Sequence, residues 1–249
     1  MLDMTALREQ VMALECTPLF VTISGAHLYG FPSPDSDVDL RGTHLLPLAA
    51  VVGLHLPRET VEKEFTVHGQ LVELVSHDLG KYLRLLVKNN GYVLEQIFSP
   101  LVVQGEEFLA ELRPLARRCI TKHHYHHYRG FIATKRKLLD QQEAKEVKSL
   151  LYAYRVLLTG IHLLRTGEVE AHLPTLATAY GLHFLLDLIA LKKEEKITAP
   201  ALDWAFHVRQ LDVLEQQMQE AYAQSSLPEE RDYAAVNALL VRRRLGDRA

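Results

Sequence analysis

Two aspartates stand one residue apart in the segment Asp37-Val38-Asp39. Successive side chains of a β-strand alternate between its two faces, so Asp37 and Asp39 would point the same way while Val38 turned into a core. Two adjacent carboxylates repel each other and are unfavourable in an apolar setting. A hard divalent cation such as Mg²⁺ relieves that repulsion and bridges to substrate phosphates, so the pair is a candidate metal site. The plainer alternative is a solvated turn, where such pairs are common.

A glycine precedes the aspartates by about a dozen residues and directly follows a short apolar run. The run, residues 19–23, is apolar and β-branched, which is typical of a buried strand. Gly25 would let the backbone approach a phosphate closely because it carries no side chain. A helix begun after Gly25 would direct the positive end of its dipole at the same anion. This order of strand, glycine, spacer and aspartate pair favours a functional site over a solvated turn.

The elements that would position these residues follow from the hydrophobic pattern. Strands are expected at 19–23, 38–46, 61–67 and 71–76, the last two as a hairpin through residues 68–70. Helices are expected at 2–15, 78–88, 92–98, 106–113, 114–140, 144–166, 175–191, 202–225 and 229–245, with a break at Gly181. We therefore predict an α+β fold, with a small mixed β-sheet domain over residues 1–115 and a C-terminal helical bundle domain over residues 116–249.

Residues 25–42 resemble the signature of the DNA polymerase β-type nucleotidyltransferase superfamily. They read Gly-Ala-His-Leu-Tyr-Gly and then, from Pro34, Pro-Asp-Ser-Asp-Val-Asp-Leu-Arg-Gly, similar to bacterial predicted nucleotidyltransferases associated with RNA-repair gene clusters. Further similarity at 81–85, 94–100, Arg155 and 163–168 extends the resemblance over roughly residues 19–170. It implies a nucleotidyltransferase core with flanking helices, and transfer of a nucleoside monophosphate from an NTP such as ATP to a hydroxyl. It also implies Mg²⁺ as the cofactor, for which Mn²⁺ would substitute.

The resemblance places a third carboxylate on a neighbouring strand, and Glu73 is a charged residue within an otherwise apolar strand. The alternative for Glu73 is a solvent-facing place on an edge strand. Asp78 is a rival, although its position suits a helix cap, and Glu62 and Glu64 are weaker candidates. With two metal ions, Glu73 would also help to deprotonate the acceptor hydroxyl. The predicted catalytic and metal-binding residues are Asp37, Asp39 and Glu73.

A basic and aromatic stripe in the helical half is the second predicted contact with nucleotide. Lys148, Tyr152 and Arg155 fall at i, i+4 and i+7 of one helix, so they share a face that suits a triphosphate and a stacked base. The alternative is a solvated basic stripe. Ala26 replaces the serine usual in the superfamily, which leaves only a backbone amide for the triphosphate. The predicted nucleotide-binding residues are Ser24, Gly25, Ala26, His27, Tyr29, Ser36, Lys148, Tyr152 and Arg155.

Histidines and basic residues are dense over residues 122–129. His123 and His127, four residues apart on a helix, could bind a transition metal, but no acid or thiol lies nearby in sequence to complete the site. Contact with nucleic-acid phosphate or with the triphosphate is a second interpretation. The third is an amphipathic helix with histidines at its rim.

Composition bounds the class of protein. The 249 residues carry a formal net charge of −3 and are 48% hydrophobic, which is ordinary for a soluble globular protein and does not by itself indicate a nucleic-acid binder. Cys16 and Cys119 are far apart, which excludes a zinc ribbon and favours two buried, reduced thiols. The sequence shows no signal peptide and no transmembrane segment, so a cytoplasmic protein without a membrane partner is expected.

The resemblance thus implies an NTP-dependent nucleotidyltransferase with Mg²⁺ as cofactor. An RNA end as the acceptor hydroxyl is implied only by the family's association with RNA-repair gene clusters. Two alternatives stay open. In one, the acceptor is a side chain of a protein partner. In the other, the chain is a catalytically lapsed module that binds nucleotide or RNA; Ala26 supports this alternative, and the intact Asp37 and Asp39 pair argues against it.

Overall fold

The computed structural model describes residues 2–14, 18–55, 57–141, 146–193 and 202–246. The described residues form two compact units. Those of the first lie within Met1–Gly25, Asp37–Cys119 and Glu230–Ala249, and those of the second lie within Ala26–Ser36 and Ile120–Glu229. A mixed sheet is combined with many helices, which confirms the predicted α+β class. The division into domains 1–115 and 116–249 stays a prediction, because compactness does not show which parts fold independently.

A five-stranded sheet in the order β3-β4-β2-β1-β5 forms the centre of the first unit. β2 and β4 run parallel, whereas the other neighbouring strands are antiparallel. The predicted hairpin is present as β3 and β4, with positive φ angles at His68 and Gly69 in its turn. The strands are β1 (Phe20–Ile23), β2 (Val38–His44), β3 (Thr60–Val67), β4 (Gln70–Asp78) and β5 (Val102–Gln104). β5 and helix α3 (Leu48–Val51) are not predicted from the sequence, because both are too short for a periodic signal.

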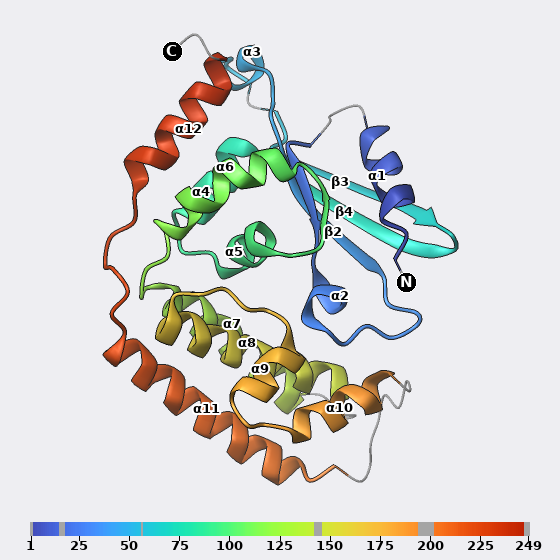
Figure 1. The fold of residues 1–249 in the computed structure, drawn as a ribbon, viewed down its shortest axis with the longest axis vertical. Helices are drawn as coiled ribbons and strands as arrows, with labels where there is room; N and C mark the ends of the chain where they lie inside the picture. Colours follow the sequence, from blue (N-terminus) through green and yellow to red (C-terminus); the bar gives the residue numbers. More distant parts are fainter. Residues whose placement is uncertain (1, 15–17, 56, 142–145, 194–201, 247–249) are drawn as a thin grey trace. The chain divides into compact units, whose positions relative to one another are not determined.

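Helices cover both faces of this sheet (Figure 1). On one face α1 (Met4–Met12) buries Leu7 and Val11 against the apolar strand residues that form the core. On the other face lie α4 (Leu79–Leu86), α5 (Gly91–Phe98) and α6 (Glu106–Arg117). Helix α12 (Tyr233–Leu245) packs beside α4, so the end of the chain belongs to the first unit.

Helix α6 continues through Pro114 to Arg117, so the prediction that one helix ends at 113 and the next begins at 114 is wrong. Proline removes one backbone hydrogen bond from a helix. Leu112 and Ala116, on either side of it, stay buried on the apolar face, and this packing holds the helix together. The next helix begins only at His124.

The second unit is a bundle around helix α8 (Val147–Thr166), most of whose residues are buried. Among the described residues, the helices that pack on α8 include α7 (His124–Gln141), α9 (Leu173–Ala179), α10 (Phe184–Lys193) and α11 (Trp204–Gln224). The expected break at Gly181 is present, with a φ of +69° between α9 and α10. Helix α2 (Gly25–Tyr29) begins at the last residue of the first unit, and its other residues belong to the second.

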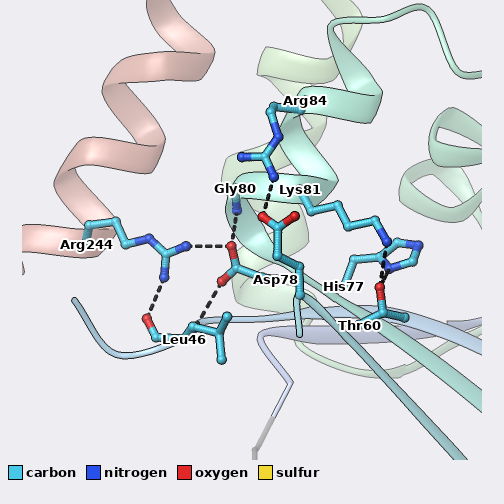
Figure 2. Close-up of polar contacts among 9 residues, drawn as sticks. Leu46, Thr60, His77, Asp78, Gly80, Lys81, Arg84 and Arg244 are labelled. Atoms are coloured by element: carbon cyan, nitrogen blue, oxygen red, sulfur yellow. Dashed lines mark hydrogen bonds and ion pairs between the residues drawn. The ribbon is translucent and has the colours of Figure 1, made fainter. Parts of the chain in front are cut away.

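Asp78 links three elements of the first unit (Figure 2). Its carboxylate caps α4 by accepting the Gly80 N–H at 2.8 Å, accepts the Leu46 N–H at 3.0 Å, and pairs with Arg244 of α12 at 2.5 Å. The side chains of Asp78 and Arg244 are 2% and 10% exposed, so this ion pair is buried. The capping role predicted for Asp78 is confirmed, and α12 is anchored through the same carboxylate.

Cys119 is a buried free thiol, as the sequence predicts, and burial raises its pKa to about 11. Cys16 lies outside the described residues. None of the helices in the described ranges is long and apolar enough to cross a bilayer. The cytoplasmic location stays a prediction.

We expect Arg244→Ala to lower the free energy of unfolding by about 3–5 kcal/mol, because it leaves the buried carboxylate of Asp78 without its counter-charge. Urea denaturation measures the change. Arg242→Ala is the matched control: that side chain is 46% exposed, so its ion pair with Glu111 should contribute no more than about 1 kcal/mol. Equal losses in the two variants would contradict the anchoring role of Arg244.

The lowered pKa of His77 leads us to expect a loss of folding stability in acid. Burial, followed by the charge of Lys81, lowers the pKa of His77 to about 4, below the unfolded value of 6.5. The unfolded chain therefore binds a proton first, and stability that is complete above pH 6.5 is lost as the pH falls towards 4. Allowing for solvent at a half-buried site, His77→Asn should reduce this loss by on the order of 1–2 kcal/mol. The urea denaturation midpoints of the wild type and of His77→Asn, measured at pH 7 and at pH 4.5, test this prediction. A midpoint that falls by the same amount between the two pH values in both proteins would refute it.

Candidate active site

Asp39 and Glu73 are neighbours across the parallel strands β2 and β4, where they stand in register. Residues in register point to the same face of a sheet, here the face opposite the core formed with α1. Both side chains are half-buried, whereas Asp37 lies just before β2 and is exposed. The fold thus brings Asp39 and Glu73 together and leaves Asp37 at the start of the strand.

Gly25 lies directly against the carboxylate of Asp39. A Cβ atom on Gly25 would stand 1.9 Å from Oδ2 and 2.7 Å from Cγ of Asp39, and the φ of Gly25 is +61°. The Ser24 N–H donates to the carbonyl oxygen of Asp39 at 2.8 Å, which continues the β1–β2 pairing up to the glycine. Residue 25 therefore has to be a glycine for a reason beyond those seen in the sequence: it leaves room for the carboxylate.

Arg41 is a site residue that the sequence analysis did not single out. Its Nη2 donates to Asp39 Oδ1 at 2.6 Å, and its Nη1 donates to the carbonyl oxygen of Glu73 at 3.1 Å. The side chains of Arg41 and Asp39 are 24% and 27% exposed, so water screens the pair only in part. The sequence does carry a signal for this role: Arg41 stands two residues after Asp39, so strand alternation places the two side chains on the same face.

Glu64 adds a carboxylate to the same face. It stands opposite Glu73 in the antiparallel pair of β3 and β4, so Glu64, Glu73 and Asp39 form a row across three strands. Glu64 is exposed and Glu73 is half-buried. The register alone does not separate the two acids, and the choice of Glu73 over Glu64 stays a prediction.

Within the part of the chain that the structure describes, no group of three or more His, Cys, Asp or Glu side chains lies close enough to hold a metal ion. Asp39 and Glu73 nevertheless fit a hard divalent cation in their chemistry, because each offers carboxylate oxygens from one of two adjacent strands. A cation bound there would share the Asp39 carboxylate with Arg41, which bonds to Oδ1. The metal-binding roles of Asp37, Asp39 and Glu73 stay predictions.

Four of the predicted nucleotide-binding residues belong to α2 and the loop after it, in the second unit. Ala26 and Tyr29 are buried, with 7% and 3% exposure, and His27 is half-buried. The Ser36 hydroxyl accepts the Ser33 N–H at 2.9 Å and stands 3.0 Å from the Ser33 hydroxyl. Ser24 and Gly25 belong to the first unit, and the hydroxyl-bearing Ser24 is itself buried.

Lys148, Tyr152 and Arg155 lie on α8 but differ in exposure. Lys148 is exposed and Tyr152 is half-buried. Arg155 is fully buried, and its guanidinium carbon stands 4.0 Å from the centroid of the Tyr29 ring. Arg155 is thus stacked on Tyr29 within the second unit.

The two histidines considered for a transition metal have different surroundings. His123 stacks on His126, with ring centroids 6.0 Å apart, and pairs with Glu229 at 2.8 Å. Burial, together with the charge of Arg155, lowers the pKa of His127 to about 4. Nothing in these contacts supports a shared metal at His123 and His127.

Residues 3–242 match the family described as RNA repair pathway DNA polymerase beta family, RlaP. The chain is 36% identical over 154 residues to the uncharacterized protein MJ0002 of Methanocaldococcus jannaschii, across 62% of this chain and 63% of that protein. It is 28% identical over 136 residues to the uncharacterized protein YcgL of Bacillus subtilis, across 55% of this chain and 51% of that protein. The chain thus spans less than two thirds of either relative.

Among solved structures, the chain is similar to a nucleotidyltransferase-like protein from Exiguobacterium sibiricum. The TM-score is 0.33 and the sequence identity 14%, over 88% of this chain and 74% of that one.

Gly25→Ala should destabilise the first unit more than Gly69→Ala does. Both glycines have positive φ, +61° and +82°, so both variants incur the left-handed penalty of about 1–2 kcal/mol. Gly69 has no atom within 4 Å of its added Cβ, whereas Gly25 meets Asp39. The overpacking adds about 1–3 kcal/mol to the cost of Gly25→Ala in urea denaturation. Equal costs would show that the close approach to Asp39 is not a constraint.

Proposed function

The chain belongs to the RNA repair pathway DNA polymerase beta family, and we propose that it is an NTP-dependent nucleotidyltransferase. In this proposal it transfers a nucleoside monophosphate to a hydroxyl at an RNA end, with Mg²⁺ as cofactor and with Mn²⁺ able to substitute. Asp37, Asp39 and Glu73 are the proposed catalytic and metal-binding residues. The acceptor is suggested by the family description, and the residues by the resemblance of residues 25–42 to the superfamily signature.

The placement of Asp39 is the observation that carries the proposal. Its carboxylate lies against the Gly25 backbone, is bonded to Arg41, and stands in register with Glu73. An aspartate in a solvated turn would not require the contact with Gly25, the bond to Arg41 or the place beside Glu73. A carboxylate held at a fixed place on a sheet, beside a second acid, suits a reaction in which charge must be neutralised at a defined position.

Each residue then has a role in the proposed reaction. Divalent metal ions, when bound, supply the positive charge that holds a triphosphate and lowers the pKa of an attacking hydroxyl. Asp37 and Asp39 are the proposed ligands, Arg41 fixes the orientation of the Asp39 carboxylate, and Glu73 accepts the proton of the acceptor hydroxyl. The acceptor oxygen forms a bond to the α-phosphorus, the bond from that phosphorus to the bridging oxygen breaks, and pyrophosphate leaves.

A transfer assay tests this proposal. The wild type is incubated with each α-³²P-labelled NTP, Mg²⁺ or Mn²⁺, and a mixture of small RNAs, beside Asp37→Ala, Asp39→Ala and the control Glu62→Gln. Glu62 is exposed and bonded to Arg58, so its variant should transfer normally. Asp37→Ala and Asp39→Ala each remove a proposed metal ligand and should reduce the label on RNA by at least about a hundredfold. Removal of a single charge-stabilising group from an active site typically lowers the rate by a factor of this size.

The other outcomes have distinct meanings. Label on a protein band, absent with Asp39→Ala, would replace the RNA acceptor by a protein acceptor. Nucleotide binding without transfer to RNA or protein would favour the lapsed module, for which Ala26 is the sequence support. Transfer that persists in Asp39→Ala would overturn the proposed catalytic residues.

A further inference from the structure

The sheet face that carries Asp39 and Glu73 continues along β4 to His77. Strand alternation returns His77, four residues after Glu73, to the same face. At a rise of roughly 3.3 Å per residue, four residues correspond to about 13 Å between the Cα atoms of Glu73 and His77. His77 stands in register with Thr43 of β2 and with Thr60 of β3. The face that holds the row of acids therefore holds a histidine further along, where β4 approaches α4.

Lys81 reaches the same place from the first turn of α4 (Figure 2). Its Nζ donates to the Thr60 hydroxyl at 2.6 Å, and Thr60 Oγ1 lies 3.0 Å from Nδ1 of His77. Helix α4, strand β4 and the edge strand β3 each supply one of these three side chains. All three residues are half-buried, so a ligand from solvent can reach them.

The hydrogen bonds assign the tautomer of His77. An ammonium group only donates, so the Thr60 hydroxyl accepts the bond from Lys81. The hydroxyl proton of Thr60 is then given to Nδ1 of His77, which accepts it. A neutral imidazole that accepts at Nδ1 carries its own proton at Nε2. The pKa of His77, lowered to about 4 by burial and by the charge of Lys81, agrees with a neutral ring at pH 7.

Lys81 and His77 consequently present donors side by side. Lys81 carries three N–H donors, and its bond to Thr60 uses one of them. Within the described ranges Lys81 forms no ion pair, whereas Arg84, one turn later on α4, pairs with Glu59. A positive point charge beside a neutral N–H donor suits the oxygens of a phosphate group.

The distance from the acids favours a nucleic-acid strand as the source of that phosphate. In the proposed reaction the acceptor hydroxyl lies beside Glu73, which accepts its proton. At a rise of roughly 3.4 Å per nucleotide, as in a duplex, a strand that ends at Glu73 covers the interval to His77 within about four nucleotides. A backbone phosphate of that strand therefore reaches Lys81, whereas a free triphosphate bound beside Asp39 stays at the row of acids.

We propose that Lys81 and His77 form a binding site for a backbone phosphate of the acceptor RNA, a few nucleotides from its reacting end. Thr60 is the positioning residue, because its hydroxyl accepts from Lys81 and donates to His77. The identity of the strand as the acceptor rests on the proposed nucleotidyltransferase function. The phosphate site does not, since it follows from the hydrogen bonds and the strand register within the first unit.

Fluorescence anisotropy of a labelled single-stranded RNA oligonucleotide, titrated with the full chain in Mg²⁺ without NTP, tests the site without turnover. Lys81→Met should weaken RNA binding by at least about tenfold, as expected for loss of a charged hydrogen bond. The slope of log K against log salt concentration should fall by about 0.7, the value for one contact with a single strand. Lys63→Met is the matched control, because Lys63 is exposed on β3 and stands opposite Leu74, on the core face. It should change binding less than about twofold.

The hydroxyl of Thr60 gives a second, independent test. Thr60→Val keeps a β-branched residue in the strand but removes the hydroxyl, so it should weaken RNA binding several-fold. Thr60→Ser keeps the hydroxyl and should bind as the wild type does. His77→Asn retains a polar atom near the position of Nδ1 but lacks the N–H at Nε2, so it should weaken binding as Thr60→Val does. A purely structural role of Thr60 would not make Ser a better replacement than Val.

Equal RNA binding by Lys81→Met and Lys63→Met, or no RNA binding by the wild type, would overturn the site. If Lys81→Met does not fold, the Thr60 variants decide, because equal binding by Thr60→Val and Thr60→Ser contradicts the assigned hydrogen bonds. Inorganic tripolyphosphate that displaces the labelled RNA as well as unlabelled RNA does would show recognition of a free polyphosphate and would refute the assignment to a strand.

The same variants separate the site from the proposed function. RNA binding that depends on Lys81, without nucleotide transfer under any condition, would mean that the proposed function fails while the phosphate site stands. Transfer with the same KM for RNA in the wild type and in Lys81→Met would mean that the function stands while the phosphate site fails.

Discussion

The carboxylate of Asp39 occupies the place where residue 25 would otherwise carry a side chain. Only glycine permits this approach, and only glycine adopts the φ of +61° at little cost. The contact requires strands β1 and β2 to keep their pairing to the end, which the bond from the Ser24 N–H to the Asp39 carbonyl provides. The geometry of the candidate site in the first unit therefore depends on the steric constraint between Gly25 and Asp39.

The rest of the first unit maintains this arrangement. Parallel pairing of β2 and β4 sets Glu73 beside Asp39, and Arg41 binds both the Asp39 carboxylate and the Glu73 backbone. β4 ends at Asp78, whose buried carboxylate starts α4 and anchors α12 through Arg244. One strand thus carries a candidate catalytic acid in its middle and the anchor of the C-terminal helix at its end. The apolar packing on α1 keeps the opposite face closed.

Strand alternation and helical periodicity are local properties, so the sequence could predict the α+β class and the hairpin. The face expected to be shared by Asp37 and Asp39 stays a prediction, because Asp37 lies just before β2. The register of β2 with β4 is non-local, so the row from Glu64 to Asp39 could only be seen in the structure. The burial of Arg155 also escaped prediction, because it depends on Tyr29, more than a hundred residues earlier in the chain. For the same reason, the return of α12 to the first unit could not be predicted from the periodicity of the sequence.

The central claim is that Asp39 is held in place to bind a divalent cation during nucleotide chemistry. Electron paramagnetic resonance titration of Mn²⁺, with a non-hydrolysable ATP analogue present, tests it most directly. The account predicts nucleotide-dependent Mn²⁺ binding that is lost in Asp39→Asn and kept in Glu64→Gln, since Glu64 stands on the same face but is exposed. Mn²⁺ binding that is unchanged in Asp39→Asn would contradict the account.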